Sequence, residues 1–386
     1  MNCMRVKSFG SVAMSVVGVL ALASCSSSGK PAQPSTSTVT SPASSTTASS
    51  PTTTSGSTIA PAGPTTTTAT THPTTPATQS APAVSATFVS PNQGFALEQN
   101  GRIAATADGG ASWKAVGSLP GHVDNGRIRF IGPSDGFAFT PGQGPLRITH
   151  DAGATWINVD TPFVNVYDLA ILRGMIYVVG MPPKNTGSFG IWSTPTGHLV
   201  WKRDPLALPI GAGPVPTEQI VLAGSGGWIL NVNRTVTSGA RLSAGNHWSA
   251  WNPPCLGKNG PAYLAASTST NLIATCEEGI WGPPARANAL YLSHNGGTTF
   301  TGRPAIGYGP VAAASPTTAI IGGNGILWRT TDGGAGWSVG AKFKIAAAIP
   351  SDLGFTNTTQ GFVIVQNGEM LMTHDGGATW QAATLP

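Results

Sequence analysis

The chain has 386 residues, of which only 9% are charged, and its formal net charge is +5. Arg5, Lys7 and Lys30 supply three of these positive charges, which leaves 17 of the 20 basic residues to face all 15 acidic residues in the remainder. This near balance argues against a nucleic-acid-binding protein, which would need a clustered excess of Lys and Arg.

Residues 1–24 predict a lipoprotein signal peptide. A basic start at Arg5 and Lys7 precedes an apolar run from Phe9 to Ala23, which is too short for a comfortable membrane span. The run ends in Leu22-Ala23-Ser24-Cys25, which resembles the lipobox where bacteria attach a diacylglyceryl group to the Cys thiol. We therefore expect Cys25 to carry lipid and to anchor an extracytoplasmic protein to the cell membrane. Ordinary signal cleavage, with Cys25 left free, is the alternative.

Residues 25–84 predict a disordered stalk behind the lipidated cysteine. Ser, Thr, Pro and Ala dominate this stretch, and Lys30 is its single charged residue. Such a composition cannot bury enough apolar surface to offset the entropy lost on ordering the chain. The stalk would hold the following domain away from the membrane, and its Ser and Thr residues could carry O-linked glycans.

The rest of the chain repeats one eight-residue phrase, Ser/Thr-x-Asp-x-Gly-x-Thr-Trp. Its five clear copies are Thr106–Trp113, Thr149–Trp156, Ser293–Phe300, Thr330–Trp337 and Thr373–Trp380. An Asp followed by small residues suits a tight turn, because its carboxylate can accept hydrogen bonds from nearby backbone N–H groups. The second Gly supplies the positive φ that such a turn needs.

We expect the acidic or amide residue of each copy to hold its turn and to perform no chemistry. These residues are Asp108, Asp151, Asn295, Asp332 and Asp375. A calcium site is the rival interpretation, but each copy offers one carboxylate and lacks the alternating ligands of a calcium loop. We therefore expect no metal and no cofactor.

The spacing of the copies predicts a propeller of seven units. The terminal aromatics lie 43 residues apart from Trp113 to Trp156, 37 from Phe300 to Trp337, and 43 from Trp337 to Trp380. The wider gap from Trp156 to Phe300 holds two eroded copies, Ser193–Trp201 and Ser243–Trp248. A fixed period of this length is typical of repeat architectures, and about four strands per unit matches a propeller blade.

Short apolar runs precede several copies, as in Phe130-Ile followed by Gly136-Phe137, or Phe355 followed by Gly361-Phe362. Together with the octapeptides, this phrasing resembles the Asp-box or bacterial neuraminidase repeat propellers, and most closely the photosystem II assembly and stability factor branch. The resemblance covers roughly residues 85–386. It implies an all-β, seven-bladed β-propeller whose partners are membrane or envelope proteins under assembly, although a photosynthetic role is not implied.

Two cysteines remain in the propeller region after the signal peptide and Cys25 are set aside. These are Cys255 and Cys276, and outside the cytoplasm such a pair favours a disulfide. The bond would connect the segment between blades 4 and 5 to blade 5, with the two Cα atoms within about 7 Å.

In Asp-box propellers the boxes connect the third and fourth strands, on the face opposite the usual ligand face. The ligand face carries the turns between second and third strands and the connections between blades. We expect the longest such turns at Met181–Gly190, Asn231–Gly239 and Cys276–Ala289. The candidate partner-binding residues on this face are Glu277, Glu278, Trp281, Arg286, Lys184, Lys258 and Tyr308. Unconstrained drift of these loops is the alternative.

The functional expectation is a non-enzymatic protein-binding or assembly scaffold, monomeric, with an envelope or membrane protein as partner. A glycan-binding propeller and a sialidase-like glycoside hydrolase are the alternatives. A sialidase needs an arginine triad and a Tyr nucleophile, and the nearest string to its first arginine motif, Arg147-Ile148-Thr149, runs straight into an octapeptide. Glu277 and Glu278 would point to opposite sides of a strand, which makes them a poor catalytic pair. We expect no catalytic residues.

Overall fold

The structure is a computed structural model that describes residues 81–184, 187–210, 217–233, 235–243, 245–258, 260–278, 287–304, 306–307, 309–346 and 348–386. The calls for a signal peptide and for Cys25, and the stalk as far as residue 80, lie outside these residues. The predicted end of the stalk at Val84 is slightly too late, because the first strand, Ala83–Phe88, already includes Ala83 and Val84 as buried residues. Within the described residues the chain forms strands and no helix. Accordingly, no helix in the described part of the chain is long and apolar enough to cross a membrane.

The strands form seven four-stranded antiparallel sheets, each built from one continuous stretch of chain. The first three sheets contain β1 (Ala83–Phe88), β2 (Gly94–Glu98), β3 (Arg102–Thr106) and β4 (Lys114–Ser118); β5 (Arg127–Phe130), β6 (Gly136–Thr140), β7 (Gln143–Thr149) and β8 (Ile157–Asn158); β9 (Asn165–Leu172), β10 (Met175–Met181), β11 (Ser188–Pro195) and β12 (Lys202–Pro209). The next two contain β13 (Thr217–Ala223), β14 (Gly226–Asn233), β15 (Thr235–Leu242) and β16 (Trp248–Trp251); β17 (Ala262–Ala266), β18 (Leu272–Glu278), β19 (Ala287–Ser293) and β20 (Thr301–Pro304). The last two contain β21 (Val311–Ala313), β22 (Ala319–Gly323), β23 (Ile326–Thr330) and β24 (Ser338–Lys342); β25 (Pro350–Phe355), β26 (Gly361–Val365), β27 (Met370–Thr373) and β28 (Gln381–Ala383).

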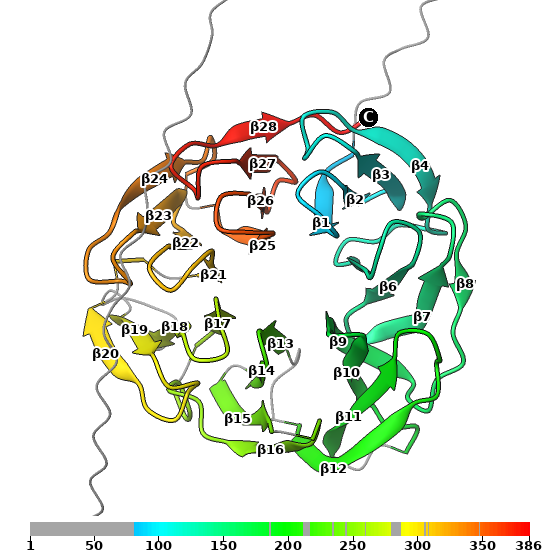
Figure 1. The fold of residues 1–386 in the computed structure, drawn as a ribbon, viewed down its shortest axis with the longest axis horizontal. Coiled ribbons are helices and arrows are strands. Elements are labelled where there is room, and N and C mark those ends of the chain that lie inside the picture. Colours follow the sequence, from blue (N-terminus) through cyan, green and yellow to red (C-terminus); the bar gives the residue numbers. More distant parts are fainter. Residues whose placement is uncertain are drawn as a thin grey trace, which may run out of the picture. The chain divides into compact units, whose positions relative to one another are not determined.

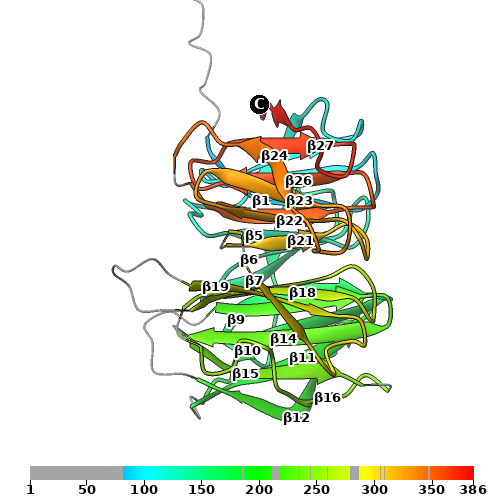
Figure 2. The same cartoon turned by 90° about the vertical axis from the view of Figure 1, so that its left-hand side faces the viewer.

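These sheets are the blades of a seven-bladed β-propeller, which confirms the predicted fold class. Figure 1 shows the first strand of every blade nearest the centre of the ring and the fourth strand at the rim. The strands run from one face of the ring to the other (Figure 2). The turns between first and second strands and between third and fourth strands therefore share one face, which we call the box face. The other face, called the loop face, carries the turns between second and third strands and the connections between blades.

The hydrophobic core is divided among the seven junctions between neighbouring blades. Each junction holds one cluster of buried side chains contributed by the two blades that meet there. Between blades 1 and 2, for example, the rings of Phe95 and Phe130 stack with their centroids 3.6 Å apart. Second strands such as β2 and β26 are buried along their whole length because blades pack against both of their faces. The rim strands are mostly exposed, as in β4.

The recurring Phe-to-Gly-Phe phrase has a steric cause. The ring of Phe88, at the end of the first strand, lies directly over Gly94, where a Cβ atom would come within 2.5 Å of the ring. A Cβ atom on Gly136 would likewise come within 2.7 Å of the ring of Phe130. Glycine is therefore required where the second strand begins, because any side chain would displace the aromatic cap.

No blade of the ring combines strands from both ends of the described chain. Blade 7 is made entirely of C-terminal strands and blade 1 entirely of β1–β4, so polar contacts join them. Asp352 of β25 accepts hydrogen bonds from the Ser85 hydroxyl (3.1 Å) and the Ala86 N–H (3.3 Å) of β1. Ala83 N–H donates to the Gly368 carbonyl (3.1 Å), and Arg102 donates to the Pro386 carbonyl.

The structure corrects two of the expected long turns. The turn expected at Asn231–Gly239 is wrong, because β14 continues to Asn233 and β15 starts at Thr235. The turn expected at Cys276–Ala289 is shorter than expected, since β18 continues through Glu278 and β19 starts at Ala287. In both places polar residues extend a hairpin, because backbone pairing with the neighbouring strand continues past the apolar run.

Candidate functional site

The five octapeptides form the turns between third and fourth strands on the box face. In blade 1, Asp108 accepts a hydrogen bond from the Ser112 N–H (2.9 Å), and one from the Ser112 hydroxyl (2.5 Å). The Thr106 hydroxyl accepts from the Gly110 N–H (2.9 Å), and Gly110 has a φ of 96°. The Trp113 indole N–H then donates back to the Gly110 carbonyl (3.1 Å). The side chains of Asp108, Thr106 and Trp113 are thus all paired within the octapeptide, while the Gly109 N–H donates to the Asn92 carbonyl (2.8 Å) outside it.

The turns of blades 2 and 7 repeat this arrangement around Asp151 and Asp375. In blade 5, Asn295 takes the place of the Asp, and its amide oxygen accepts from the Thr299 N–H (2.9 Å). In blade 6, Asp332 accepts from the Gly336 N–H (2.9 Å), and because residue 336 is glycine it offers no hydroxyl to the carboxylate.

These hydrogen bonds keep the box carboxyls ionised. Bonds from Ser112 and from Thr155 lower the pKa of Asp108 and Asp151, respectively, to about 2. For Asp375, desolvation acts to raise the pKa, but the bonds from Thr379 and Thr373 outweigh it and lower the pKa to about 2. A backbone bond from Gly336 likewise lowers the pKa of Asp332. Such groups are poorly suited to donate a proton near neutral pH.

The two eroded copies also lie between third and fourth strands, in blades 3 and 4. In blade 4, both the N–H and the hydroxyl of Ser243 donate to the His247 carbonyl, at 2.8 and 2.7 Å. The Trp248 N–H donates to Asp204 of blade 3 (3.0 Å). The degenerate turn of blade 4 therefore takes a carboxylate acceptor from a neighbouring blade, where the complete turns use their own Asp or Asn.

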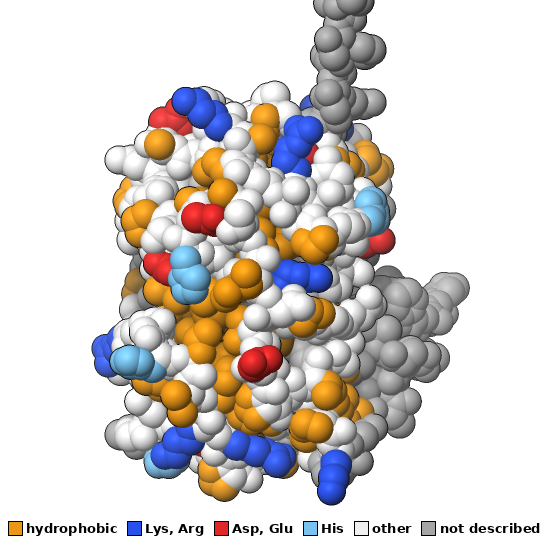
Figure 3. Space-filling view, turned by 90° about the vertical axis from the view of Figure 1, so that its right-hand side faces the viewer, with side chains coloured by type: hydrophobic (Ala, Val, Ile, Leu, Met, Phe, Trp, Pro, Cys, Tyr) orange, Lys and Arg blue, Asp and Glu red, His pale blue; other side chains and the backbone are white. Residues whose placement is uncertain are grey.

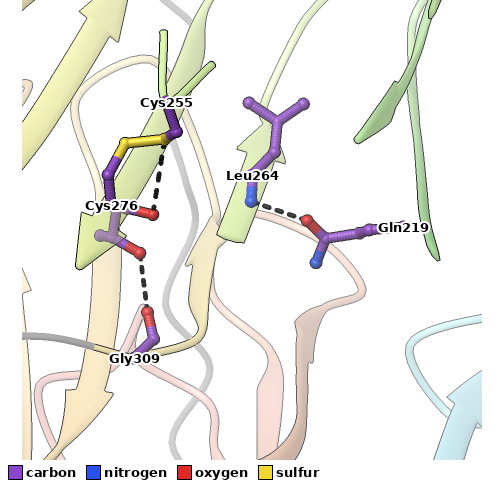
Figure 4. The surroundings of a disulfide bond; sticks show 6 residues. Gln219, Cys255, Leu264, Cys276 and Gly309 are labelled. Carbon is purple, nitrogen blue, oxygen red and sulfur yellow. Dashed lines mark hydrogen bonds between the residues drawn. A yellow bond between two sulfur atoms is a disulfide. The ribbon is translucent and has the colours of Figure 1, made fainter. Parts of the chain in front are cut away.

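A disulfide joins Cys255 to Cys276 on the loop-face side of blade 5, with Cα atoms 5.7 Å apart (Figure 4). This confirms the predicted pairing. Both cysteines are buried. Next to the bond, the Thr275 hydroxyl donates to the Gly309 carbonyl (2.8 Å). One disulfide and one hydrogen bond thus connect the bases of three neighbouring segments, residues 252–261, the β18–β19 hairpin and the connection leading to β21.

The structure brings some of the candidate partner-binding residues to the loop face and leaves others untested. Lys184 is exposed in the turn between β10 and β11, and Lys258 is half-buried in the connection between blades 4 and 5. Glu277 and Glu278 lie at the end of β18, paired in register with Asn288 and Ala287. Trp281, Arg286 and Tyr308 lie outside the described residues.

Sequence reasoning missed a set of polar residues on the first strands. Four blades carry an acceptor at the same register position, where its side chain binds a backbone N–H of the next blade. The pairs are Asp352 with Ala86 (3.3 Å), Ser85 with Ile128 (3.3 Å), Asp168 with Ile220 (2.7 Å) and Gln219 with Leu264 (2.7 Å). In the sequence, a polar residue inside an otherwise apolar first strand was the signal that could have predicted these contacts. The last of these pairs is visible in Figure 4.

Blade 2 has Arg127 at this position, and an arginine cannot accept a hydrogen bond. Arg127 instead donates to the carbonyls of Val84 in blade 1 (3.1 Å) and Ser351 in blade 7 (3.2 Å). The N–H of Leu169 in blade 3 is satisfied by its own neighbour, Asp168 (2.9 Å). Burial raises the pKa of Asp168, and the positive charge of Arg129 opposes this rise. This inner network joins the first strands of neighbouring blades to one another.

Among the described residues, no cluster of three or more His, Cys, Asp or Glu side chains could hold a metal ion. A shallow box-face pocket between blades 5 and 6 has a cavity of only about 20 Å³ and is bordered by Asn271, His294 and Thr317. That volume is about the size of one water molecule.

The fold and its turns define a seven-bladed β-propeller, and comparison with known proteins agrees at that level. No family model matches the chain, and no curated protein matches it. Among solved structures it is similar to YCF48 bound to D1 peptide, with 18% identity, coverage of 77% of this chain and 94% of that one, and a TM-score of 0.56.

Two further structures have the same TM-score. YCF48 from Cyanidioschyzon merolae is 15% identical, covering 78% of this chain and 97% of that one, with a TM-score of 0.56. An inactive virginiamycin B lyase from Staphylococcus aureus with quinupristin is 12% identical, covering 77% and 96%, again with a TM-score of 0.56. At these identities the likeness establishes the fold alone, and the neighbours include both a peptide-bound propeller and a lyase.

Proposed function

We propose that this protein is an exported, lipid-anchored propeller that serves as a non-enzymatic protein-binding or assembly scaffold at the cell surface. The observation that carries the proposal is the braced loop face of blades 4 and 5. There the Cys255–Cys276 disulfide and the Thr275–Gly309 hydrogen bond hold adjacent segments at their bases. A rigid base reduces the entropy lost when the surrounding side chains contact a partner, which favours binding.

The chemistry of the acidic residues supports a binding role over a hydrolytic one. The box carboxylates are engaged in turn hydrogen bonds, and three of them have a pKa of about 2. Glu277 and Glu278 occupy successive positions of β18. A glycosidase requires two carboxyl groups facing one substrate bond.

The solved structure of YCF48 with a D1 peptide supports a protein segment as the class of ligand. For the present chain we take over only the use of a propeller surface to bind a polypeptide. A photosynthetic partner is not part of the proposal.

Anchorage is tested through Cys25. In the bacterial host, Cys25→Ala should move the protein from the membrane fraction to the soluble fraction, because one thiol carries the whole lipid attachment. Mass spectrometry of the wild type should show a mature N-terminus at a lipid-modified Cys25. Cys3→Ala is the control and should change nothing. Unaltered membrane attachment in Cys25→Ala would remove the anchor from the proposal.

Partner binding is tested through the loop face. Trp281→Ala and Arg286→Ala should each weaken partner capture at least tenfold while the melting temperature stays within about 2 °C, because Trp and Arg dominate interface energies. Capture is measured by quantitative cross-linking in detergent-solubilised membranes, with His122→Ala, in the connection between blades 1 and 2, as control. Normal capture by both variants would place the functional surface elsewhere, and binding to a glycan array would favour a carbohydrate ligand.

A further inference from the structure

The seven blades act as an internal alignment, and one core position departs from it. The fifth residue of the second strand is uncharged in six blades, as Thr140, Val179, Leu230, Cys276, Gly323 and Val365. Blade 1 has Glu98 there, and this side chain is fully buried, with an exposed fraction of 0%. Burying a carboxyl group is unfavourable unless its charge is paired or hydrogen-bonded. Packing within the blade therefore does not explain Glu98, because apolar residues fill the same position in other blades.

The carboxyl group of Glu98 is only partly satisfied where it lies. On the side of the ring that carries blades 1 to 3, Figure 3 shows acidic side chains scattered singly over the outer surface, where water solvates them. Glu98 has no such contact with water. Its Oε2 atom accepts a hydrogen bond from the Ala81 N–H (3.1 Å). Its Oε1 atom is buried and has no hydrogen-bond partner among the described residues.

The N–H bound by this carboxyl group belongs to a segment that joins the first and last blades. We call this segment, residues 81–83, the entry clasp, since the predicted stalk precedes it in the sequence. On blade 1, the Pro82 carbonyl accepts from the Gln99 N–H (2.8 Å). On blade 7, the Gly368 carbonyl accepts from the Ala83 N–H (3.1 Å). The clasp thus spans the junction between blades 7 and 1, which lie side by side in Figure 1.

The surroundings of Glu98 favour its neutral form. Burial raises the pKa of this carboxyl group above its ordinary value of 4.5, and the positive charge of Arg102 and the hydrogen bond from Ala81 oppose only part of the rise. Opening of the clasp would expose the carboxyl group to water and return its pKa to the ordinary value. A proton on Glu98 therefore stabilises the closed clasp, and this stabilisation is lost as pH rises through the raised pKa.

Other charged groups surround the clasp on every neighbouring element. They are Arg102 on β3, His122 and Asp124 on the connection to blade 2, Asp352 on β25, and Lys344 and Glu369 on the loop face of blades 6 and 7. Each of them has a polar partner other than Glu98, as in the ion pair of Lys344 with Glu369 (2.9 Å). Within the described chain, Glu98 is the carboxylate with a buried and unpartnered oxygen.

We propose that Glu98 and the entry clasp form a proton-controlled closure of the ring. While Glu98 holds its proton, residues 81–83 stay fastened to blades 1 and 7. When Glu98 releases the proton to solvent, the clasp opens more often and the start of the propeller is held less firmly. The device lies at the junction of blades 7 and 1, so it depends neither on the lipid anchor nor on the braced loop face of blades 4 and 5.

Hydrogen exchange of the full chain tests the proposal from about pH 4 to pH 8, after correction for the intrinsic effect of pH on exchange. The N–H groups of Ala83 and Gln99 report the clasp. Their protection in the wild type should fall about tenfold per pH unit between the open and closed pKa values of Glu98, and then level off. The box carboxyls do not contribute, because their pKa of about 2 keeps them ionised throughout this range.

Glu98→Gln keeps the shape of the side chain and an acceptor oxygen but cannot ionise. In this variant the protection of Ala83 and Gln99 should no longer depend on pH. Glu98→Val introduces the residue that blades 3 and 7 use at this position and should also remove the dependence. Glu369→Gln, at the same junction, is the matched control and should behave like the wild type.

Two results would overturn the proposal. One is protection in the wild type that stays constant over this pH range, which would mean that the clasp does not respond to a proton. The other is a pH dependence that persists in Glu98→Gln or disappears in Glu369→Gln, because a different group would then control the closure.

Discussion

The turn of blade 1 and the turn of blade 4 connect equivalent strands but are held by different partners. In blade 1, Asp108, Thr106 and Trp113 satisfy one another and the backbone within eight residues. In blade 4, the N–H of Trp248 depends on Asp204, which belongs to blade 3. A complete box supplies the side-chain acceptor for its own turn. A degenerate box makes the corner depend on its neighbour, so changes in blades 3 to 5 should spread further than changes in blades 1, 2 and 7.

The disulfide gives the largest test of this contrast. Replacing both Cys255 and Cys276 with Ser should lower the free energy of unfolding by about 3 kcal/mol, because the bond closes a loop with a sequence separation of 21 residues. Chemical denaturation measures the loss. Hydrogen exchange should accelerate first in β17 and β18, whereas β2 and β3 of blade 1 serve as the internal control. An equal increase in all blades would contradict the proposed difference between the two regions.

Asp204 gives the next largest effect. Asp204→Ala leaves the N–H groups of Trp248 and Leu206 without their acceptor and should lower the free energy of unfolding by about 2 kcal/mol. The loss should appear as faster hydrogen exchange in blade 4 as well as in blade 3. Asp151→Ala is the matched variant in a complete box, and it should lower the melting temperature by about 2–4 °C with exchange confined to blade 2. Confinement of both effects to one blade would refute the coupling.

The smallest expected effect is a dependence on acid. The folded pKa of Asp108, Asp151 and Asp375 is about 2, below the ordinary value of 3.8. A depressed carboxyl pKa stabilises the folded state above the unfolded pKa, and this stabilisation is lost as pH falls from about 4 to 2. Melting temperature should therefore fall more steeply over this range in the wild type than in a variant with all three residues changed to Asn. Asn295→Asp should add acid sensitivity in blade 5, and its absence would mean that the turn bonds do not control the ionisation.

Most of the fold could be predicted because its signals are local. Every octapeptide contains the donors, acceptors and glycines of its own turn, so spacing alone predicted seven blades, including the two whose copies are eroded. The same reasoning failed at Asn231–Gly239 and at Glu277–Glu278, where polar residues suggested loops. There the neighbouring strand supplied the hydrogen bonds that extended the hairpin. Cysteine counting predicted the disulfide, because only two thiols remained to pair.

The sequence by itself therefore determined the number of blades, the order of their strands, the turns on the box face and the Cys255–Cys276 bond. Only the tertiary structure decided how neighbouring blades meet. The contact of Asp352 with β1 and the hydrogen bond from Arg127 to the Ser351 carbonyl of blade 7 each join residues from different blades. Such contacts depend on the ring placing distant segments side by side, and a repeat pattern describes each blade but not the partner that it faces.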